Sequence, residues 1–350
     1  MRARDKQLEV LYIGQRRGVE AGLAHTANLP FRGIEGGKLR RLPGAGFWRN
    51  LIQLDSMILN LRDSVLIAIG AIQAFWILRR YRPDVIFNKV GPAGIPVGIA
   101  AHILQIPMVI HEPDFTPGMA NRILARWATR IAVGFPVKLY TAFPAAKLVY
   151  TGTPVQPAVL KGDHKRGRKN FGFSQKRPLI LVVGGSQGAH SLNQAIMTVL
   201  PGLLWDTQVH HIVGSHDYRR LSRQAAHFEG YRVDEFLSVP EMADAYAAAD
   251  IVIARGGANT IAELAALHKP TILVPNREAA AHQIQNAARL AEAGAALAIS
   301  DEYPDELLAA VRQLLSSHTE QEHLAKGIAP FNVPEAATKL ANLITEAVAK

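Results

Sequence analysis

The sequence predicts an α/β fold of parallel sheets that is divided into two domains. Short runs rich in β-branched residues alternate with helical segments along almost the whole chain, which is the pattern of βα units. The length of 350 residues is too great for one ordinary domain and suits two. The pattern breaks at residues 154–168, where glycines, prolines and a run of charges indicate a domain boundary.

The first predicted domain spans residues 1–156. Its expected strands are residues 8–13, 84–88, 107–111 and 130–133. Helices are expected between them, including residues 93–104. Another helix is expected from Thr116-Pro117 to about Trp127, because proline after a threonine cap is a helix start signal.

The second predicted domain spans residues 157–333. A strand followed by a loop, and usually by a helix, recurs along it. The expected strands are residues 178–183, 208–213, 250–254, 271–275 and 295–299. The last helical segment, residues 334–350, is long enough to return to the first domain, and we expect it to join that domain.

The composition limits the classes of protein that fit. Hydrophobic residues make up 49% and charged residues 19%, as in a soluble globular protein with substantial cores. The absence of cysteine excludes disulfides and thiolate metal sites. The start of the chain has no basic stretch followed by an apolar one, so we expect no secretion signal.

The positive charge of the chain is concentrated in its first half. The net charge is +10, and residues 1–150 contain 20 Lys and Arg against 9 Asp and Glu. Such an excess attracts phosphates, either on nucleic acid or on the anionic inner face of a membrane, unless it is merely a solvated basic surface. No zinc-finger spacing or RNA-recognition signature is present, so nucleic acid is disfavoured.

The stretch SVLIAIGAIQAFWILRRYR favours a membrane among these partners. Residues 64–78 are apolar except for Ser64 and Gln73, and arginines flank them. Fifteen residues fall short of the roughly 20 that cross a bilayer. The segment is therefore either a buried core helix or a helix that lies on the membrane surface, with its apolar side in the lipid.

The stretch LILVVGGSQGAHSLNQAI contains the sharpest local signal. A buried strand ends at Val183, and a glycine-rich turn leads into a helix, where backbone N–H groups can bind an anion. The residues of this expected phosphate loop are Gly185, Ser186, Gln187 and Gly188. Two alternatives stay open. One is a purely structural turn, and the other is the G-x-S-x-G nucleophile elbow of hydrolases, with Asp250 and His282 as partners.

Two more polar loops follow later strands. The stretch ARGGANTIAEL again runs from strand to Gly-Gly to helix, and Glu263 can reach the vicinal hydroxyls of a ribose. In AAAHQIQN, His282 and Asn286 share a helix face, and amides suit sugar hydroxyls. All these loops follow strands of one sheet, where open α/β sheets bind ligands. The candidate residues are Gly257, Ala258, Asn259, Thr260, Glu263, His282, Gln283 and Asn286.

These residues resemble those of the MurG family, the bacterial transferases that convert lipid I to lipid II with UDP-N-acetylglucosamine. The resemblance lies in residues 184–193, Glu235-Phe236-Leu237 followed by Met242, residues 255–263 and residues 282–286. In the first domain, HEPDFTPGMANRILARWA is similar to the family's HEQN-type loop and helix. The likeness covers nearly the whole chain from Leu8 onward.

The resemblance implies the GT-B architecture, with two Rossmann-like domains that face a cleft. It also implies an inverting hexosyltransferase without a metal or other cofactor, and the chain contains no Asp-x-Asp. Asn193 would follow the diphosphate loop. The implied donor contacts are Phe236 and Leu237 to the uracil, Glu263 to the ribose, Ser186 and the Gly257-Ala258 backbone to the diphosphate, and His282 with Gln283 to the sugar.

The acceptor side is implied to lie in the first domain. The acceptor of the family is a polyprenyl diphosphate lipid of peptidoglycan synthesis, so the implied location is peripheral, on the cytoplasmic face of the cell membrane. The nearest matching candidates for a general base are His111 and Glu112, and a loop-orienting role for His111 is equally open. The implied acceptor-side residues are Gly91, Asp114 and Asn121.

The chain also departs from the family pattern. In the family, a strand, a glycine-rich loop ending in histidine and a helix precede the segment that begins here at Leu8. Residues 90–94 replace a GGYVS-like loop, and Gln156 replaces an arginine. We therefore expect either a start site assigned too late or a shortened relative. The alternative functions are a non-catalytic UDP-sugar-binding protein and a glycosyltransferase with another lipid acceptor.

Overall fold

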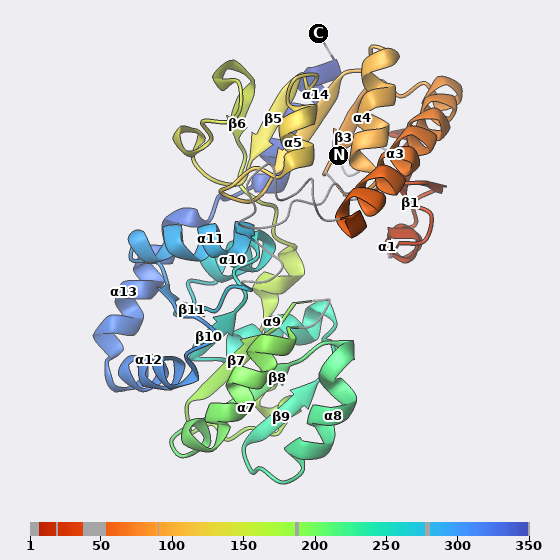
Figure 1. Cartoon of the computed structure of the whole chain (residues 1–350). Coiled ribbons are helices and arrows are strands. Elements are labelled where there is room, and N and C mark those ends of the chain that lie inside the picture. Colours follow the sequence, from red (N-terminus) through yellow and green to blue (C-terminus); the bar gives the residue numbers. More distant parts are fainter. Residues whose placement is uncertain are drawn as a thin grey trace. The chain divides into compact units, whose positions relative to one another are not determined.

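The computed structural model describes residues 7–18, 20–37, 54–89, 91–185, 189–276 and 281–348 (Figure 1). Within these ranges the chain divides into two compact units. Unit 1 comprises Met1–Glu112, Pro117–Thr151 and Ala337–Lys350, and unit 2 comprises Pro113–Thr116 and Gly152–Ala336. Residues 337–348 therefore belong to the same unit as residues 7–18.

The described part of unit 1 contains a two-stranded and a four-stranded sheet, both parallel. The first sheet pairs β1 (Tyr12–Gln15) with β2 (Phe31–Ile34). The second, in spatial order, consists of β3 (Ile86–Asn88), β4 (Met108–Glu112), β5 (Arg130–Val133) and β6 (Leu148–Tyr150). The helices between the strands are α1 (Glu20–Thr26), α3 (Leu54–Tyr81), α4 (Gly94–Ile103) and α5 (Met119–Leu124).

The C-terminal helix α14 (Ala336–Val348) packs on the four-stranded sheet of unit 1. Its apolar side chains recur at helical spacing and meet Val109 of β4 and Ala132 of β5. The helix residues in this core are Leu340, Leu343, Ile344 and Ala347.

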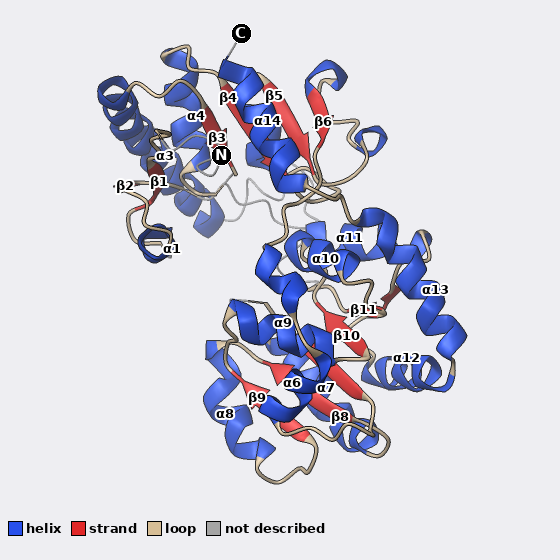
Figure 2. Cartoon of the chain, turned by 180° about the vertical axis from the view of Figure 1, so that it is seen from behind, coloured by secondary structure: helices blue, strands red, loops and turns tan. Residues whose placement is uncertain are grey.

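Unit 2 is built on one six-stranded parallel sheet, and Figure 2 shows its strands side by side with helices around them. In spatial order the strands are β12 (Leu297–Ala298), β11 (Thr271–Leu273), β10 (Ile251–Ala254), β7 (Leu179–Val183), β8 (Gln208–Ile212) and β9 (Tyr231–Asp234). Every residue of β7, β8, β10 and β11 is buried, because helices cover both faces of a parallel sheet.

The helices of unit 2 follow its strands in the expected alternation. They are α6 (His164–Phe171), α7 (His190–Leu204), α8 (Ser215–Ala225), α9 (Val239–Ala248), α10 (Ala258–Ala266), α11 (Ala281–Glu292), α12 (Pro304–Ser316) and α13 (His318–Ile328). Short 3₁₀ helices occur at Val137–Leu139, Ala145–Lys147, Pro157–Lys161 and Ala329–Phe331.

The parallel α/β fold is confirmed, and several predicted boundaries are wrong. The first strand begins at Tyr12, where pairing with β2 begins, and not at Leu8. The predicted helix from Thr116 begins only at Met119, because the backbone N–H of Gly118 donates to the carboxylate of Glu112. The short strands β2, β6 and β9 were not expected.

We expect Leu343→Ala to destabilise unit 1. Leu343 is 4% exposed in the core between α14 and the sheet, so its truncation removes buried apolar surface and leaves a cavity. The free energy of unfolding, measured by chemical denaturation, should fall by about 2–5 kcal/mol. The exposed position Glu346 on the same helix is the control, and Glu346→Ala should change stability by less than about 0.5 kcal/mol. Equal effects of both substitutions would contradict this packing.

Candidate functional site

The loops after β7 and β10 meet at one edge of the unit 2 sheet. The two strands are paired in parallel, with Val183 opposite Ala254, so both end at the same edge. Glycines follow each strand. Gly185 has a φ of +92° and Gly256 has a φ of +81°, a backbone conformation that residues with a Cβ rarely adopt. Both turns therefore require glycine at these positions.

Each turn leads into a helix that lacks a side-chain cap among the described residues. α7 begins at His190 after Ala189, and α10 begins at Ala258 after Gly257. The first N–H groups of such a helix remain available to a ligand, and the helix dipole favours negative charge there. Two neighbouring helix starts suit a ligand with adjacent phosphates. The predicted loop residues Ser186, Gln187 and Gly188 lie outside the described residues.

A buried ion pair connects these two helix starts. The guanidinium of Arg255, which precedes Gly256, donates to the carboxylate of Asp301 at 2.9 Å and to the Oγ of Ser191 at 2.6 Å. Ser191 lies in the first turn of α7 and in turn donates to Asp301 at 2.6 Å. Arg255 also donates to the carbonyl of Val274, after β11. We call Arg255, Asp301 and Ser191 the Arg255 network.

Glu263 of α10 lies one to two turns beyond the second glycine turn. Its Oε2 accepts a hydrogen bond of 2.9 Å from the hydroxyl of Tyr246, which is 1% exposed. Burial raises the pKa of Glu263, and the bond from Tyr246 opposes that rise. Among the described residues no other hydrogen bond to this carboxylate is formed, so Tyr246 orients one oxygen and a ligand can approach the other.

Six predicted residues of the donor site are exposed or half-buried. His282 is exposed at the start of α11, and Gln283 is half-buried, where its side-chain oxygen accepts from the backbone N–H of Asn276 at 3.1 Å. Phe236 is 51% exposed after β9, beside the half-buried Leu237. On α10, Asn259 is exposed and Thr260 is half-buried.

Asn286 of α11 is fully buried and binds protein groups on every side. Its amide donates to the carboxylate of Asp114 at 2.8 Å and to the carbonyl of Gly256 at 3.0 Å. Its oxygen accepts from the backbone N–H of Phe115 at 3.1 Å. In this structure Asn286 therefore holds residues 113–116 and the second glycine turn in place.

Asn193 of α7 is also fully buried. Its oxygen lies 3.0 Å from Nε2 of His211, and its amide donates to the carbonyl of Val213 at 3.1 Å and to the carboxylate of Asp217 at 2.8 Å. These bonds attach the first turn of α7 to the end of β8 and the start of α8. Asn193 thus positions the helix that follows the first glycine loop.

The acceptor-side candidates of unit 1 gather at the end of β4. His111 and Glu112 are 0% and 2% exposed. The carboxylate of Glu112 accepts from the backbone N–H of Gly118 at 2.9 Å and from the amide of Asn121 at 2.8 Å, so it holds the turn that leads into α5. Gly91 is exposed after β3, and its carbonyl accepts from Gly94.

The hydrolase alternative is wrong, because its acid lies at the opposite edge of the sheet. Asp250 precedes β10, and its carboxylate accepts from the backbone N–H of Leu179, the first residue of β7, and from Arg168. Ser186, in contrast, follows the end of β7. A nucleophile and its acid cannot be at opposite ends of the same pair of strands.

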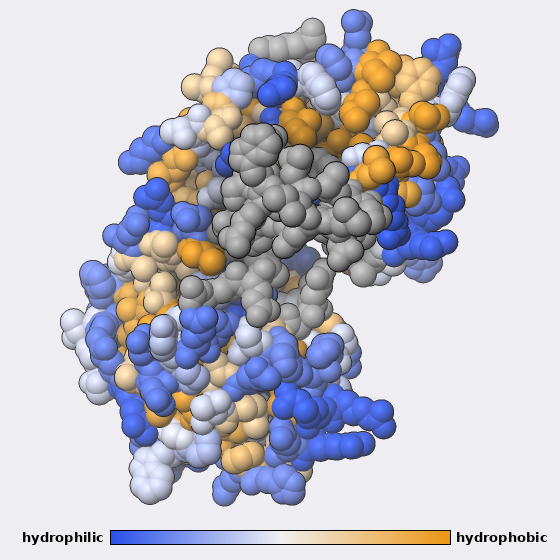
Figure 3. All heavy atoms as spheres, in the orientation of Figure 1, coloured by the Kyte–Doolittle hydropathy of each residue, from blue (hydrophilic) through white to orange (hydrophobic). Residues whose placement is uncertain are grey.

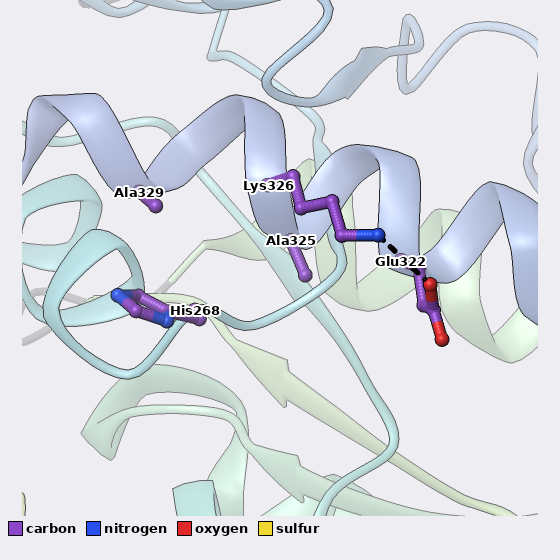
Figure 4. A pocket seen from close by; sticks show the side chains of 5 residues that line it. All are labelled: His268, Glu322, Ala325, Lys326 and Ala329. Atoms are coloured by element: carbon purple, nitrogen blue, oxygen red, sulfur yellow. Dashed lines mark hydrogen bonds and ion pairs between the residues drawn. The ribbon is translucent and has the colours of Figure 1, made fainter.

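A surface pocket in unit 2 has no part in this site. It lies between α13 and the residue His268 that follows the C-terminal end of α10, at the far end of that helix from Gly257 (Figure 4). The ion pair of Glu322 and Lys326, 3.0 Å apart, borders it. Ala325 and Ala329 complete its lining.

Sequence reasoning missed Arg255 and Tyr246. An arginine directly before a glycine turn at a strand end was a visible signal, but its partners Ser191 and Asp301 are 64 and 46 residues away. Tyr246 lies 17 residues before Glu263, and no motif in the sequence connects the two.

Comparisons with known proteins show the family of the chain. Residues 2–133 match the model of the glycosyltransferase family 28 N-terminal domain, and residues 179–340 match that of its C-terminal domain. A UDP-N-acetylglucosamine--N-acetylmuramyl-(pentapeptide) pyrophosphoryl-undecaprenol N-acetylglucosamine transferase from Lachnospira eligens is 39% identical over 310 residues, which cover 87% of this chain and 82% of the relative. A Bacillus anthracis transferase with the same name, followed by the number 2, is 34% identical over 97% of this chain and 92% of the relative.

Solved structures share the fold. The crystal structure of Acinetobacter baumannii MurG superposes with a TM-score of 0.71 at 24% identity, covering 99% of this chain and 93% of that one. A UDP-GlcNAc 2-epimerase from Neisseria meningitidis, bound to UDP-GlcNAc, gives a TM-score of 0.70 at 14% identity over 97% and 91% of the chains.

The matches to both domain models of glycosyltransferase family 28 show that the chain is a glycosyltransferase, and its two parallel-sheet units have the GT-B architecture, as the resemblance implied. Within that class, the chain belongs to the MurG family.

We expect Asp301→Asn to destabilise unit 2, because Arg255 would remain buried without its counter-charge. The free energy of unfolding should fall by about 3–5 kcal/mol at neutral pH, whereas Asp305→Asn, at an exposed position nearby, should change it by less than about 0.5 kcal/mol. Chemical denaturation of the parent and both variants measures these differences.

The same pair predicts a pH dependence. Burial raises the pKa of Asp301, but hydrogen bonds from Ser191 and Arg255 outweigh burial and lower it below its ordinary value of 3.8. The unfolded chain therefore binds a proton first as the pH falls, and the stabilisation is lost as the pH falls through the folded-state pKa. The parent and Asp301→Asn should then converge in stability. A difference that persists in acid would contradict the pairing.

Proposed function

We propose that this chain transfers N-acetylglucosamine from UDP-N-acetylglucosamine to N-acetylmuramyl-(pentapeptide) pyrophosphoryl-undecaprenol, the acceptor for which its relatives are named, and so forms lipid II. The observation that carries this proposal is the pairing of β7 with β10, which brings two glycine turns and two helix starts to one edge. A nucleotide diphosphate fits that arrangement because both of its phosphates meet helix N-termini.

In the proposed reaction, an acceptor hydroxyl attacks the anomeric carbon from the face opposite UDP. The new C–O bond forms as the bond to the diphosphate breaks, so the configuration inverts, and the hydroxyl proton leaves to a general base. Negative charge develops on the departing diphosphate. The N-termini of α7 and α10 stabilise that charge, so the scheme needs no metal ion.

The donor contacts that we propose follow from accessibility. Glu263 binds the ribose hydroxyls through the oxygen that Tyr246 does not occupy. Phe236 and Leu237 cover the uracil from the end of β9, and His282 and Gln283 bind the sugar hydroxyls from the start of α11. The buried Asn193 and Asn286 act by positioning these loops.

The general base is not assigned to the pair at the end of β4. His111 and Glu112 are buried, and the carboxylate of Glu112 already holds Gly118 and Asn121. We therefore propose that this pair shapes the turn that leads into α5, on the acceptor side.

We expect Glu263→Gln to weaken donor binding. Loss of a charged hydrogen bond to the ribose should raise the Kd for UDP and the KM for UDP-N-acetylglucosamine by about 5–150-fold, corresponding to about 1–3 kcal/mol. Calorimetry with UDP and a transfer assay with a lipid I analogue measure the two constants. The control is Glu306→Gln, at an exposed position of α12.

Two outcomes of that experiment would count against the proposal. An unchanged Kd in Glu263→Gln would contradict the ribose contact. Saturable UDP binding by the parent chain without any transfer to the lipid I analogue would favour the non-catalytic alternative. Transfer to a different polyprenyl diphosphate lipid would show that the proposed acceptor is wrong.

We also propose that unit 1 binds an anionic membrane surface through α3. Large apolar side chains with a spacing of three or four residues are 40–69% exposed along one face of this helix: Leu61, Val65, Ile69, Ile72 and Trp76. Apolar surface gathers over α3 and α4 in Figure 3. Basic residues lie beside these side chains and suit lipid phosphates: Arg62, Arg79 and Arg80.

The packing of α3 favours a helix that lies on the membrane and does not cross it. By length and composition alone, residues 60–81 could span a bilayer. However, the opposite face packs on the protein. Gly70 lies so close to the carbonyl oxygen of Glu35 that a Cβ would not fit there, and the side chain of Gln73 accepts from the backbone N–H of Glu35 at 2.8 Å. The exposed face alone is available to lipid.

We expect Trp76→Glu to reduce binding to vesicles that contain anionic phospholipid. Trp76 is 63% exposed on α3, so the substitution should cost little stability while placing a negative charge among the lipid headgroups. Cosedimentation should detect a loss of at least about tenfold in affinity. Trp205 of unit 2, 83% exposed, supplies the matched control Trp205→Glu, which should bind as the parent does. Equal losses in both variants would contradict the assignment to α3.

A further inference from the structure

A cluster of metal-ligating side chains lies beside the first glycine loop and has no part in the proposed transfer. His190 is the first residue of α7, and His216 and Asp217 lie in the first turn of α8. β7 and β8 are paired in parallel, so these two helices start at the same edge of the sheet. One potential ligand atom from each side chain lies within 4.8 Å of the other two.

The separations fit a small cation held between the three groups. Nδ1 of His190 lies 3.0 Å from each carboxylate oxygen of Asp217, and Nδ1 of His216 lies 3.6 Å from Oδ1. Two ligands that are each about 2.1 Å from a zinc ion lie about 3.0–3.4 Å apart at right or tetrahedral angles. The distances from His190 to Asp217 fit this spacing, and the exposed His216 side chain, which is 75% accessible, has to move closer to Asp217.

The groups behind the cluster hold the ligands in place. The carboxylate of Asp217 is 3% exposed, and its Oδ2 accepts from the buried amide of Asn193 at 2.8 Å. On the other side of His190, Nε2 lies 2.9 Å from the amide of Gln194, which can turn to accept the ring N–H of a metal-bound imidazole. Such outer contacts orient metal-binding carboxylates and histidines.

The competing partner of the Asp217 carboxylate is an arginine. The guanidinium of Arg220 lies 3.1 Å from Oδ1, and the side chain is 48% exposed, so it can move into solvent when a cation arrives. The central carboxylate argues against an anion at this position.

We propose that His190, His216 and Asp217 bind a divalent transition-metal ion of the zinc type, with water completing its coordination. Two imidazoles and one carboxylate suit Zn²⁺ and its neighbours and do not suit Mg²⁺ or Ca²⁺, which prefer oxygen ligands. Such an ion joins the starts of α7 and α8. Because α7 follows the first glycine loop, the ion restrains the helix start that borders the proposed diphosphate site.

Titration of the whole chain with Zn²⁺ alone tests the proposal without any donor or acceptor. Calorimetry should detect one saturable site, and Co²⁺ should acquire visible absorption bands that Zn²⁺ abolishes. His190→Gln and His216→Gln should each weaken binding by at least about tenfold. Both histidines are on the surface, with side chains 52% and 75% accessible, so these variants keep the fold.

Two further variants sharpen the result. Arg220→Gln removes the competing charge and should tighten Zn²⁺ binding. His227→Gln changes an exposed histidine outside the cluster and should bind Zn²⁺ as the parent does. The absence of saturable binding by the parent would overturn the proposal, and so would binding that His190→Gln and His216→Gln leave unchanged.

Discussion

The parallel pairing of β7 with β10 is the constraint on which the rest of the site depends. It places two glycine turns and two helix starts at one edge, although 71 residues separate the paired positions 180 and 251. The Arg255 network reinforces this arrangement, because a buried guanidinium that loses its carboxylate partner destabilises the fold. Arg255 joins the second turn to Ser191 of α7 and to Asp301 beyond β12. The spacing between the helix starts is thus maintained by a polar contact that is costly to break.

The polar side chains around the edge divide into two kinds. Glu263 and His282 offer hydrogen-bonding atoms to a ligand, whereas Asn193 and Asn286 are fully buried and use theirs within the protein. A buried amide with every bond satisfied gives rigidity to the loops that it joins. Glu112 has the same role in unit 1, where its carboxylate replaces a side-chain cap before α5. Rigid loops suit the proposed diphosphate site, because a charged diphosphate needs donors that are already in place.

Unit 1 uses apolar surface in two different ways. Its last helix, α14, buries Leu343 against the sheet and so contributes to the core. α3, in contrast, has one face packed through Gly70 and another that leaves Ile72 and Trp76 in solvent. This exposed apolar face and the excess of basic residues in this half of the chain are the grounds for the proposed contact with a lipid surface.

The sequence by itself determined the fold class, the alternation of strands and helices, and the glycine turns, because these depend on local periodicity and on backbone conformations near particular residues. It could also identify Glu263 as a ligand candidate from its place after a turn. It could not determine that Asn286 is buried, that Arg255 pairs with Asp301, or that Tyr246 orients Glu263. Those contacts join residues far apart in the chain, so only the tertiary structure decided them. Burial, which separates a positioning side chain from a binding one, is likewise a property of the packed whole.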